Sequence, residues 1–214
     1  MTARQLIPAG RTRAEIRVVN SRFIATLAPV FRVEEARNFI EDIRTEFRDA
    51  THNVPLYIVG HGASITAHSS DDGEPSGTAG RPALAVLQGS GLGDAAVVIT
   101  RYFGGTKLGT GGLVRAYSHA VRAVLEITPL AEKIPTHTVL LSVPYNAYER
   151  LEILAAEYRG QVLEKDFAGD VTFTLRFPQS SLPAFERALQ ELTRGACAPI
   201  VIHSEENTIY PISP

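Results

Sequence analysis

The side chains best suited to chemistry are gathered in two glycine-rich passages. The first is DDGEPSGTAG, residues 71–80, and the second is TRYFGGTKLGTGGLVRAY, residues 100–117. The first supplies carboxylates, which can act as acids, bases or metal ligands, and the second supplies cations, which can bind phosphate. Together the passages give these candidate site residues: Asp71, Asp72, Glu74, Ser76, Arg101, Tyr102, Phe103, Gly104, Gly105, Lys107, Gly111, Gly112 and Arg115.

The established nucleotide-binding loops do not fit these glycines. A phosphate loop has glycine directly before its lysine, whereas Lys107 follows Thr106. The dinucleotide fingerprint GxGxxG would need glycine at two positions that are Asp94 and Val114 here. Ser76 lacks the G-x-S-x-G surroundings of a hydrolase nucleophile. The spacing therefore argues against these three kinds of site.

The second passage has the features of an anion-binding surface. A buried strand is expected to end at residues 101–103, and Gly109–Gly112 lead into a helix whose free N-terminal amides carry partial positive charge. The glycines would let a partner approach the backbone closely. The alternative is that the glycines only form tight turns and that Arg101 pairs with one of the three acids of the first passage. The spacing leaves both interpretations open.

The acids of the first passage fit a metal site poorly. Asp71 and Asp72 are adjacent, so their side chains are expected to point apart, and the neighbouring glycine and proline favour a turn. A magnesium or calcium cage needs several convergent oxygens. His52, His61 and His68 are too far apart along the chain for a local ligand pair. We predict no metal and no cofactor.

The elements that must position these passages form an α+β chain of two domains. The first domain is expected to have strands at 15–20, 23–30, 54–59 and 95–99 and helices at 34–49, 82–87 and 112–125. The second is expected to have strands at 138–143, 160–167, 171–177 and 198–202 and helices at 146–158 and 182–192. This second set has the βαββαβ order of a ferredoxin-like sandwich. Two prolines within 128–138 place the domain boundary there, giving domains 1–133 and 134–214.

Composition and charge exclude several classes of protein. A chain of 214 residues with 44% hydrophobic and 21% charged residues is neither disordered nor fibrous. Its net charge of -2 is unlike that of a dedicated nucleic-acid binder. Phe173 and Phe177 alternate with polar residues, which places them in the core and not on an RNA-stacking face. No apolar run is long enough to span a membrane, so we expect a cytoplasmic protein without membrane contact.

Both passages closely resemble the YigZ branch of the IMPACT family. Two shorter segments share the resemblance, namely Ser21 to Phe23 and Ala50 to His52, and it covers about residues 13–127 and extends loosely into the second domain. It implies an N-terminal α/β sandwich like the second domain of a small-subunit ribosomal protein, a fold also shared by small-molecule kinases. It implies a C-terminal domain like domain V of elongation factor G. Eukaryotic members of the family are translation regulators that compete for an activator of a starvation-responsive kinase.

These observations lead to two hypotheses of different class. In the first, the chain is a regulator of translation, active in stress, that binds RNA, the ribosome or a translation factor without catalysing a reaction. Arg101, Lys107 and Arg115 would contact phosphate or an acidic partner, and Tyr102 and Phe103 would stack or pack. In the second, the same site is that of an enzyme acting on a phosphorylated small molecule or nucleotide.

Overall fold

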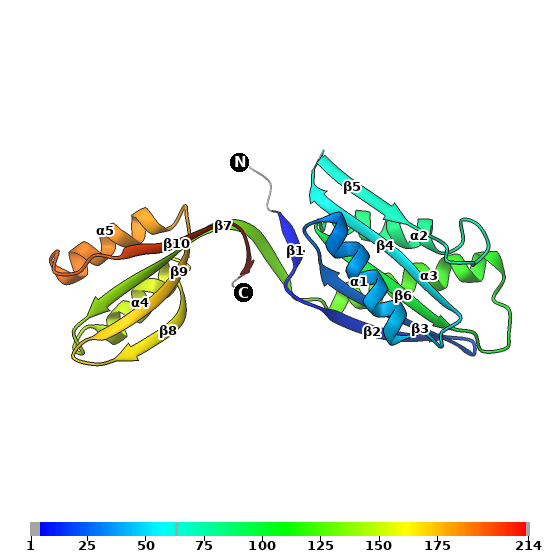
Figure 1. The fold of residues 1–214 in the computed structure, drawn as a ribbon, viewed down its shortest axis with the longest axis horizontal. Coiled ribbons are helices and arrows are strands. Elements are labelled where there is room, and N and C mark those ends of the chain that lie inside the picture. Colours follow the sequence, from blue (N-terminus) through cyan, green and yellow to red (C-terminus); the bar gives the residue numbers. More distant parts are fainter. Residues whose placement is uncertain (1–4, 63, 213–214) are drawn as a thin grey trace. The chain divides into compact units, whose positions relative to one another are not determined.

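The computed structural model describes residues 5–62 and 64–212, and the chain forms two compact units. Unit 1 is Met1–Glu132 and unit 2 is Lys133–Pro214. Each unit combines helices with an antiparallel sheet, so the α+β class predicted from the sequence is confirmed (Figure 1).

Unit 1 is built on one antiparallel sheet. Its strands, in spatial order, are β2 (Thr12–Val18), β3 (Ser21–Pro29), β6 (Ala95–Tyr102), β4 (His52–His61) and β5 (Ser64–Ser69). β6 lies in the middle, between β3 and β4. Every residue of β6 except Tyr102 is buried, because helices cover both faces of the sheet at this point.

Three helices form the outer layers of unit 1. They are α1 (Val33–Glu46), α2 (Gly80–Gly89) and α3 (Gly109–Ile127). In Figure 1, α1 lies in front of the sheet, and α2 and α3 lie behind it. Side chains alternate along β6, so Val97 and Ile99 pack in the core with α2 and α3, whereas Ala96 and Val98 pack in the core with α1.

Unit 1 also contains two differences from the sequence-based expectation. The strands predicted at 15–20 and 23–30 are present as a hairpin, but its two-residue turn is at Val19 and Asn20 and not at residues 21–22, because Val18 pairs with Ser21. The segment Ser64–Ser69 was expected to be a loop and is the edge strand β5. Its residues are mostly exposed, so it lacks the apolar pattern by which a strand is recognised.

The proline-containing stretch at the boundary is a strand and not a loop. β7 runs without a break from Leu130 to Val143, across the division between the units. Its first residues pair with β1 (Leu6–Pro8), and Thr136–Val143 pair with β9. Pro135 lies between these two paired segments, where a missing backbone N–H breaks neither ladder.

Unit 2 has the predicted βαββαβ order. It consists of β7, α4 (Tyr148–Glu157), β8 (Gln161–Phe167), β9 (Val171–Pro178), α5 (Leu182–Thr193) and β10 (Ile200–Pro211). The strands lie in the order β10-β7-β9-β8, which is the split arrangement of this topology. Phe173 and Phe177 are fully buried, as their alternation with polar residues predicted. In contrast, Ile200, Val201 and Ile202 of β10 are 65%, 46% and 53% exposed.

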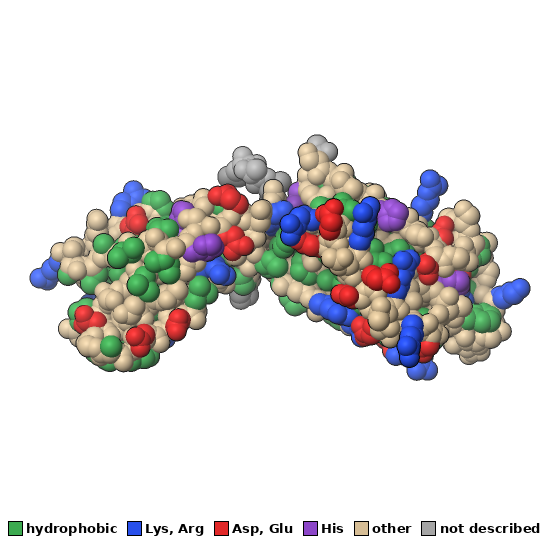
Figure 2. Space-filling model, viewed as in Figure 1, with side chains coloured by type: hydrophobic (Ala, Val, Ile, Leu, Met, Phe, Trp, Pro, Cys, Tyr) green, Lys and Arg blue, Asp and Glu red, His purple; other side chains and the backbone are tan. Residues whose placement is uncertain are grey.

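The described part of the chain has no helix that is both long enough and apolar enough to cross a membrane. On the face shown in Figure 2, basic and acidic side chains are interspersed over unit 1. Ion pairs account for part of this pattern, since Arg11 and Arg13 both bind Glu46, and Arg44 binds Asp72. This face therefore presents no broad patch of one sign.

Candidate functional site

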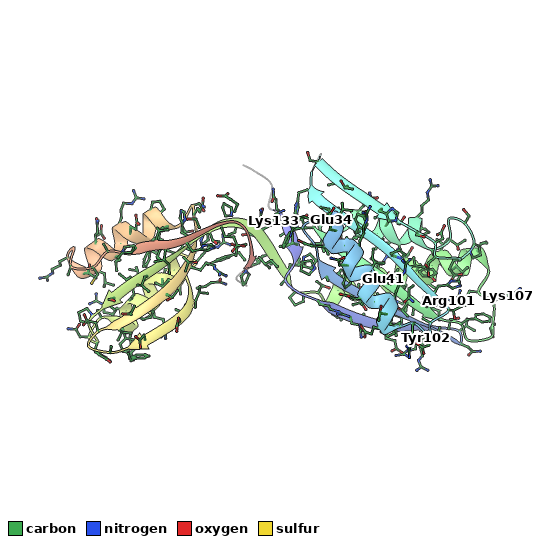
Figure 3. The ribbon with its side chains drawn as sticks, viewed as in Figure 1. Glu34, Glu41, Arg101, Tyr102, Lys107 and Lys133 are labelled. Atoms are coloured by element: carbon green, nitrogen blue, oxygen red, sulfur yellow. The ribbon has the colours of Figure 1, made fainter. Side chains whose placement is uncertain are left out.

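A cavity of about 440 Å³ opens at the end of β6, where the two glycine-rich passages meet. We call it the β6 cleft. Its lining residues are Thr51, His52, Glu74, Pro75, Arg101, Phe103, Lys107, Leu108, Gly109, Thr110 and Leu113. Figure 3 shows Arg101 and Lys107 at the same end of unit 1. Of the predicted site residues, the structure brings four to this cleft: Glu74, Arg101, Phe103 and Lys107.

A buried ion pair forms one wall of the cleft. Arg101 Nη1 donates a hydrogen bond to Glu74 Oε1 at 2.5 Å, and both side chains are almost entirely buried. The Tyr117 hydroxyl donates to the same oxygen at 2.7 Å. Burial raises the pKa of Tyr117 far above its ordinary value, and the bond to Glu74 raises it further. Tyr117 is therefore a neutral donor that helps Arg101 to hold the carboxylate.

Aromatic rings and one hydroxyl fix the guanidinium of Arg101. Its central carbon lies 5.4 Å from the Phe23 ring centre and 5.5 Å from that of Phe103. Its Nη2 lies 3.3 Å from Ser21 Oγ. The Nε atom is buried without a hydrogen-bond partner among the described residues. These contacts hold the guanidinium of Arg101 in a defined position.

His52 presents one ring nitrogen to the cleft. Its Nδ1 lies 2.7 Å from the Asp72 carbonyl oxygen, and because a carbonyl can only accept, Nδ1 must carry the proton. Nε2 lies 3.8 Å from Glu74 Oε1, which is beyond hydrogen-bond distance. In the neutral ring, Nε2 therefore keeps its lone pair and can accept a proton or a hydrogen bond from a bound molecule.

Asp71 lies outside the cleft lining and organises the loop before α2. Its carboxylate accepts hydrogen bonds from the backbone N–H groups of Gly77, Ala79 and Gly80 at 2.8–3.1 Å. Burial acts to raise the pKa of Asp71, but these three bonds outweigh burial and the pKa lies below its ordinary value. Asp71 therefore serves as a cap for the start of α2, which has no cap from its own N-cap residue Ala79.

Asp72 also has a structural position. Its Oδ1 is 3.1 Å from Arg44 Nη2, and its Oδ2 accepts a bond from the Asn53 backbone N–H at 2.7 Å. Through its carbonyl it sets the orientation of His52. The adjacent acids of the first passage thus point to different partners, as their adjacency predicted. Among the described residues there is no cluster of three or more His, Cys, Asp or Glu side chains that could hold a metal ion.

Several other predicted residues do not reach the cleft. Ser76 is exposed and is not among the lining residues. Tyr102 follows Arg101 in the strand and so faces the opposite side of the sheet, where its hydroxyl donates to Asp49 at 2.9 Å. Four glycines, Gly104, Gly105, Gly111 and Gly112, form the turn after β6 and the first turn of α3 without lining the cleft.

Gly104 has a specific steric role in the turn after β6. A Cβ atom at this position would overlap the backbone carbonyl of Asn20 in the β2–β3 turn. Arg115, in contrast, is separated from the cleft by helix geometry. It comes two residues after the lining residue Leu113, and a step of two residues along a helix turns the side-chain direction by about 200° around the axis. Arg115 consequently lines a different groove on the far side of α3.

Reasoning from the sequence missed two contributors to the site. Tyr117 was placed within the predicted helix 112–125 but not among the candidate site residues, although its hydroxyl reaches Glu74. His52 was considered only among three histidines too widely spaced along the chain to form a local metal-ligand pair. A clue was present in both cases, because His52 and Tyr117 belong to the segments that carry the family resemblance. The suggested alternative pairing of Arg101 with an acid of the first passage is present, and the acid is Glu74.

The mouth of the cleft has an excess of positive charge. The charges of Glu74 and Arg101 compensate each other. Lys107 is exposed, with no ion pair to a described residue, and it lies beside the first turn of α3. Leu108, at the N-cap of α3, has no side chain that can accept from the free amides of that turn. The arrangement suits an anionic group at the mouth, with an apolar portion against Phe103 and Leu113.

Comparison with known proteins agrees with the assignment suggested by these residues. The model of the Impact N-terminal domain matches residues 19–125. The IMPACT family member YigZ of Escherichia coli (strain K12) is 36% identical over 192 residues, which cover 89% of this chain and 94% of that protein. The chain belongs to the IMPACT family.

Other similarities cover most of the chain, including part of unit 2. A second family model, a Domain of unknown function (DUF1949), matches residues 141–196 in unit 2. The IMPACT family member YvyE of Bacillus subtilis (strain 168) is 38% identical, and the match covers 85% of this chain and 83% of that protein. A solved structure described as "Crystal structure of an hypothetical protein" has a TM-score of 0.61 at 35% identity and covers 96% of this chain and all of its own.

Proposed function

We propose that this IMPACT family member is a cytoplasmic regulator of translation, acting in stress, whose β6 cleft binds an anionic group of RNA, of the ribosome or of a translation factor. The observation that carries the proposal is Lys107 beside the uncapped first turn of α3, above an ion pair that contributes no net charge. The likeness of the two domains to a ribosomal-protein domain and to domain V of elongation factor G belongs to the same proposal.

The proposal depends on how charge is divided between the depth and the mouth of the cleft. A carboxylate as deeply buried as Glu74 would repel an anion if it were alone. Arg101 and Tyr117 both donate to it, so the field of the carboxylate at the mouth is reduced. Lys107 and the partial charge of the helix N-terminus then determine the sign of the group that binds.

A filter-binding titration with RNA at low salt tests the proposal. Lys107→Ala is the informative variant, because this exposed side chain can be removed without disturbing the core. We expect it to weaken binding by about fivefold to tenfold and to make the salt dependence shallower by about 0.7 in the log–log slope. Lys107→Arg keeps the charge and serves as the control. Undetectable RNA binding, together with no recovery of ribosomes or translation factors in pull-downs, would reject the proposal.

A second candidate is an enzyme that acts on a phosphorylated small molecule or nucleotide. It is favoured by the concave shape of the cleft and by the titratable groups inside it, since His52 Nε2 and Glu74 face one cavity. The phosphate would bind at Lys107, and His52 would accept a proton.

Thermal unfolding in the presence of nucleotides and sugar phosphates, with and without magnesium, separates the two candidates. A specific ligand present at about 100 times its Kd would stabilise the fold by about 2.7 kcal/mol. A response that disappears in His52→Ala would support the enzyme, whereas no response to any compound would favour the regulator.

A further inference from the structure

A second groove, also of about 440 Å³, lies on the side of α3 that faces away from the β6 cleft. Three of its lining residues carry basic or hydrogen-bond-donating side chains: Arg115, His119 and Arg122. Val18 of β2 and Val114 of α3 contribute apolar surface to the same groove. We call this feature the α3 groove. It shares no lining residue with the β6 cleft, so the two sites can be altered separately.

The Arg115, His119 and Arg122 side chains of the α3 groove are exposed and unpaired. None of them forms an ion pair or a hydrogen bond with another described residue. Other arginines of unit 1 behave differently, since Arg22 binds Glu15 at 2.8 Å and Arg44 binds Asp72 at 3.1 Å. An external anion can therefore bind the basic side chains of the groove without first breaking an ion pair within the protein.

The spacing of these residues indicates the shape of the anion. His119 follows Arg115 by four positions, and Arg122 follows His119 by three, so the three are distributed over about 10 Å of the helix axis. They fall within about 60° around that axis, which places them in a row on one face. A row of charges fits a linear polyanion, whereas a single phosphate would require cations that converge on one point.

We propose that the α3 groove binds a strand of single-stranded RNA. Arg115 and Arg122 contact successive phosphates, and His119 donates to the sugar between them. A base or sugar packs against Val18 and Val114, which supply the apolar part of the groove. This combination of aligned cations and apolar wall favours a nucleic acid over an acidic protein segment. The proposal does not depend on the function assigned to the β6 cleft.

Fluorescence anisotropy with a labelled oligouridylate tests the proposal on the full chain. The double variant Arg115→Ala, Arg122→Ala removes two phosphate contacts from exposed positions, so the fold should be retained. We expect affinity to fall about tenfold or more, and the log–log slope between roughly 50 and 200 mM salt to become shallower by about 1.4, which is 0.7 for each lost contact on a single strand. His119→Ala should produce a smaller loss of affinity.

Two matched variants make the result specific. Arg187→Ala removes an exposed arginine from α5 in unit 2 and should leave affinity and slope unchanged. Lys107→Ala reports on the β6 cleft alone, so failure of the proposed function and failure of this inference are distinguishable. The inference is overturned if the double variant binds oligouridylate as the parent chain does, if the parent chain does not bind it at low salt, or if oligoglutamate displaces the RNA more effectively than unlabelled RNA does.

Discussion

Glu74 is held at the β6 cleft by two donors from different elements, Arg101 at the end of β6 and Tyr117 in α3. Taking an ion pair out of water is costly, and the pair is retained only while each charge has its partner. The three residues come from segments far apart in the sequence. The ion pair therefore joins the loop before α2 to the central strand and to α3.

Removing one member of this ion pair should be far more harmful than removing both. We expect Arg101→Ala to lower the free energy of unfolding by about 3–5 kcal/mol, because a buried carboxylate is left without its cation. The double variant Glu74→Leu, Arg101→Met should recover most of that loss. Urea denaturation measures both values, and Arg122→Ala, an exposed arginine, is the control. A cost below about 1 kcal/mol for Arg101→Ala would show that the pair is not buried in solution.

Asp71 should make the stability of the protein dependent on pH in the acidic range. Its pKa in the folded protein is lower than the ordinary value of about 3.9, so its stabilising contribution is complete above about pH 4 and is lost as the pH falls through the folded-state pKa. Asp71→Ala should cost about 0.5–2 kcal/mol at neutral pH. The difference from the parent chain should shrink towards low pH. Ser76→Ala, in the same loop, should change stability at neither pH.

The positions of individual side chains were only partly predictable from the sequence. The meeting of Glu74 with Arg101 was among the pairings considered, because opposite charges lay in the two passages. The separation of Arg115 from Lys107 was not foreseen. The two residues are close in sequence, but Arg115 points away from the side of α3 on which Leu113 lines the cleft. The role of Asp71 depends on hydrogen bonds from backbone N–H groups. Nearly every residue has such a group, so no pattern of residue types indicates which of them a carboxylate will bind.

At the scale of elements, the turn between β2 and β3 packs directly on the turn after β6. The contact is made by the Asn20 carbonyl and Gly104, and glycine is required because any side chain would overlap that carbonyl. Ser21 extends the same contact, since its hydroxyl accepts from Arg101 and lies 3.4 Å from the Gly104 backbone nitrogen. The β2–β3 turn therefore helps to hold the cleft residue Arg101 in place, through the hydroxyl of Ser21.

Gly104→Ala should disturb this packing. We expect a loss of about 1–3 kcal/mol in the free energy of unfolding, because two backbone segments must move apart. Binding at the β6 cleft should weaken as well, since Arg101 and Lys107 flank the displaced turn. Gly89→Ala is the matched control: no atom lies within 4 Å of a Cβ at that position. Equal stability of the two alanine variants would contradict the close approach at Gly104.

Elements with strong hydrophobic periodicity were predictable, and those without it were not. The stripe that begins at Leu113 predicted α3, and the apolar run from Ala95 predicted β6. β5 was missed because its exposed face on the sheet edge carries no such pattern. The start of β7 was missed because the two prolines of residues 128–138 suggested a loop, whereas pairing with β1 makes Leu130–Glu132 a strand.

At the scale of the whole molecule, each unit has its own hydrophobic core. The main hydrophobic cluster of unit 2 is formed by residues between Val139 and Leu189, and the two main clusters of unit 1 are formed by residues between Phe23 and Val124. β7 crosses the division between the units, but its pairing with β9 involves only Thr136–Val143. A cut between Glu132 and Lys133 therefore leaves the main cluster of each unit intact, together with the β1–β7 and β7–β9 strand pairings.

Fragments 1–132 and 133–214 should therefore each fold alone. We expect both to give cooperative thermal transitions by circular dichroism, because domains with complete cores fold independently. A fragment that begins at Leu141 removes part of the β7–β9 ladder and is the matched control; it should fail to fold. A non-cooperative transition for fragment 133–214 would show that unit 2 is not an independent domain.

The exposed strand β10 has a practical consequence for handling the protein. Ile200, Val201 and Ile202 are all substantially exposed, and among the described strands β10 pairs with β7 alone. An open strand edge with consecutive apolar side chains is a template for pairing with the same strand of another molecule. Concentrated or warmed samples should accordingly lose material to β-rich aggregates that start at this strand, and the substitution Val201→Lys is the simplest means of keeping the protein dispersed.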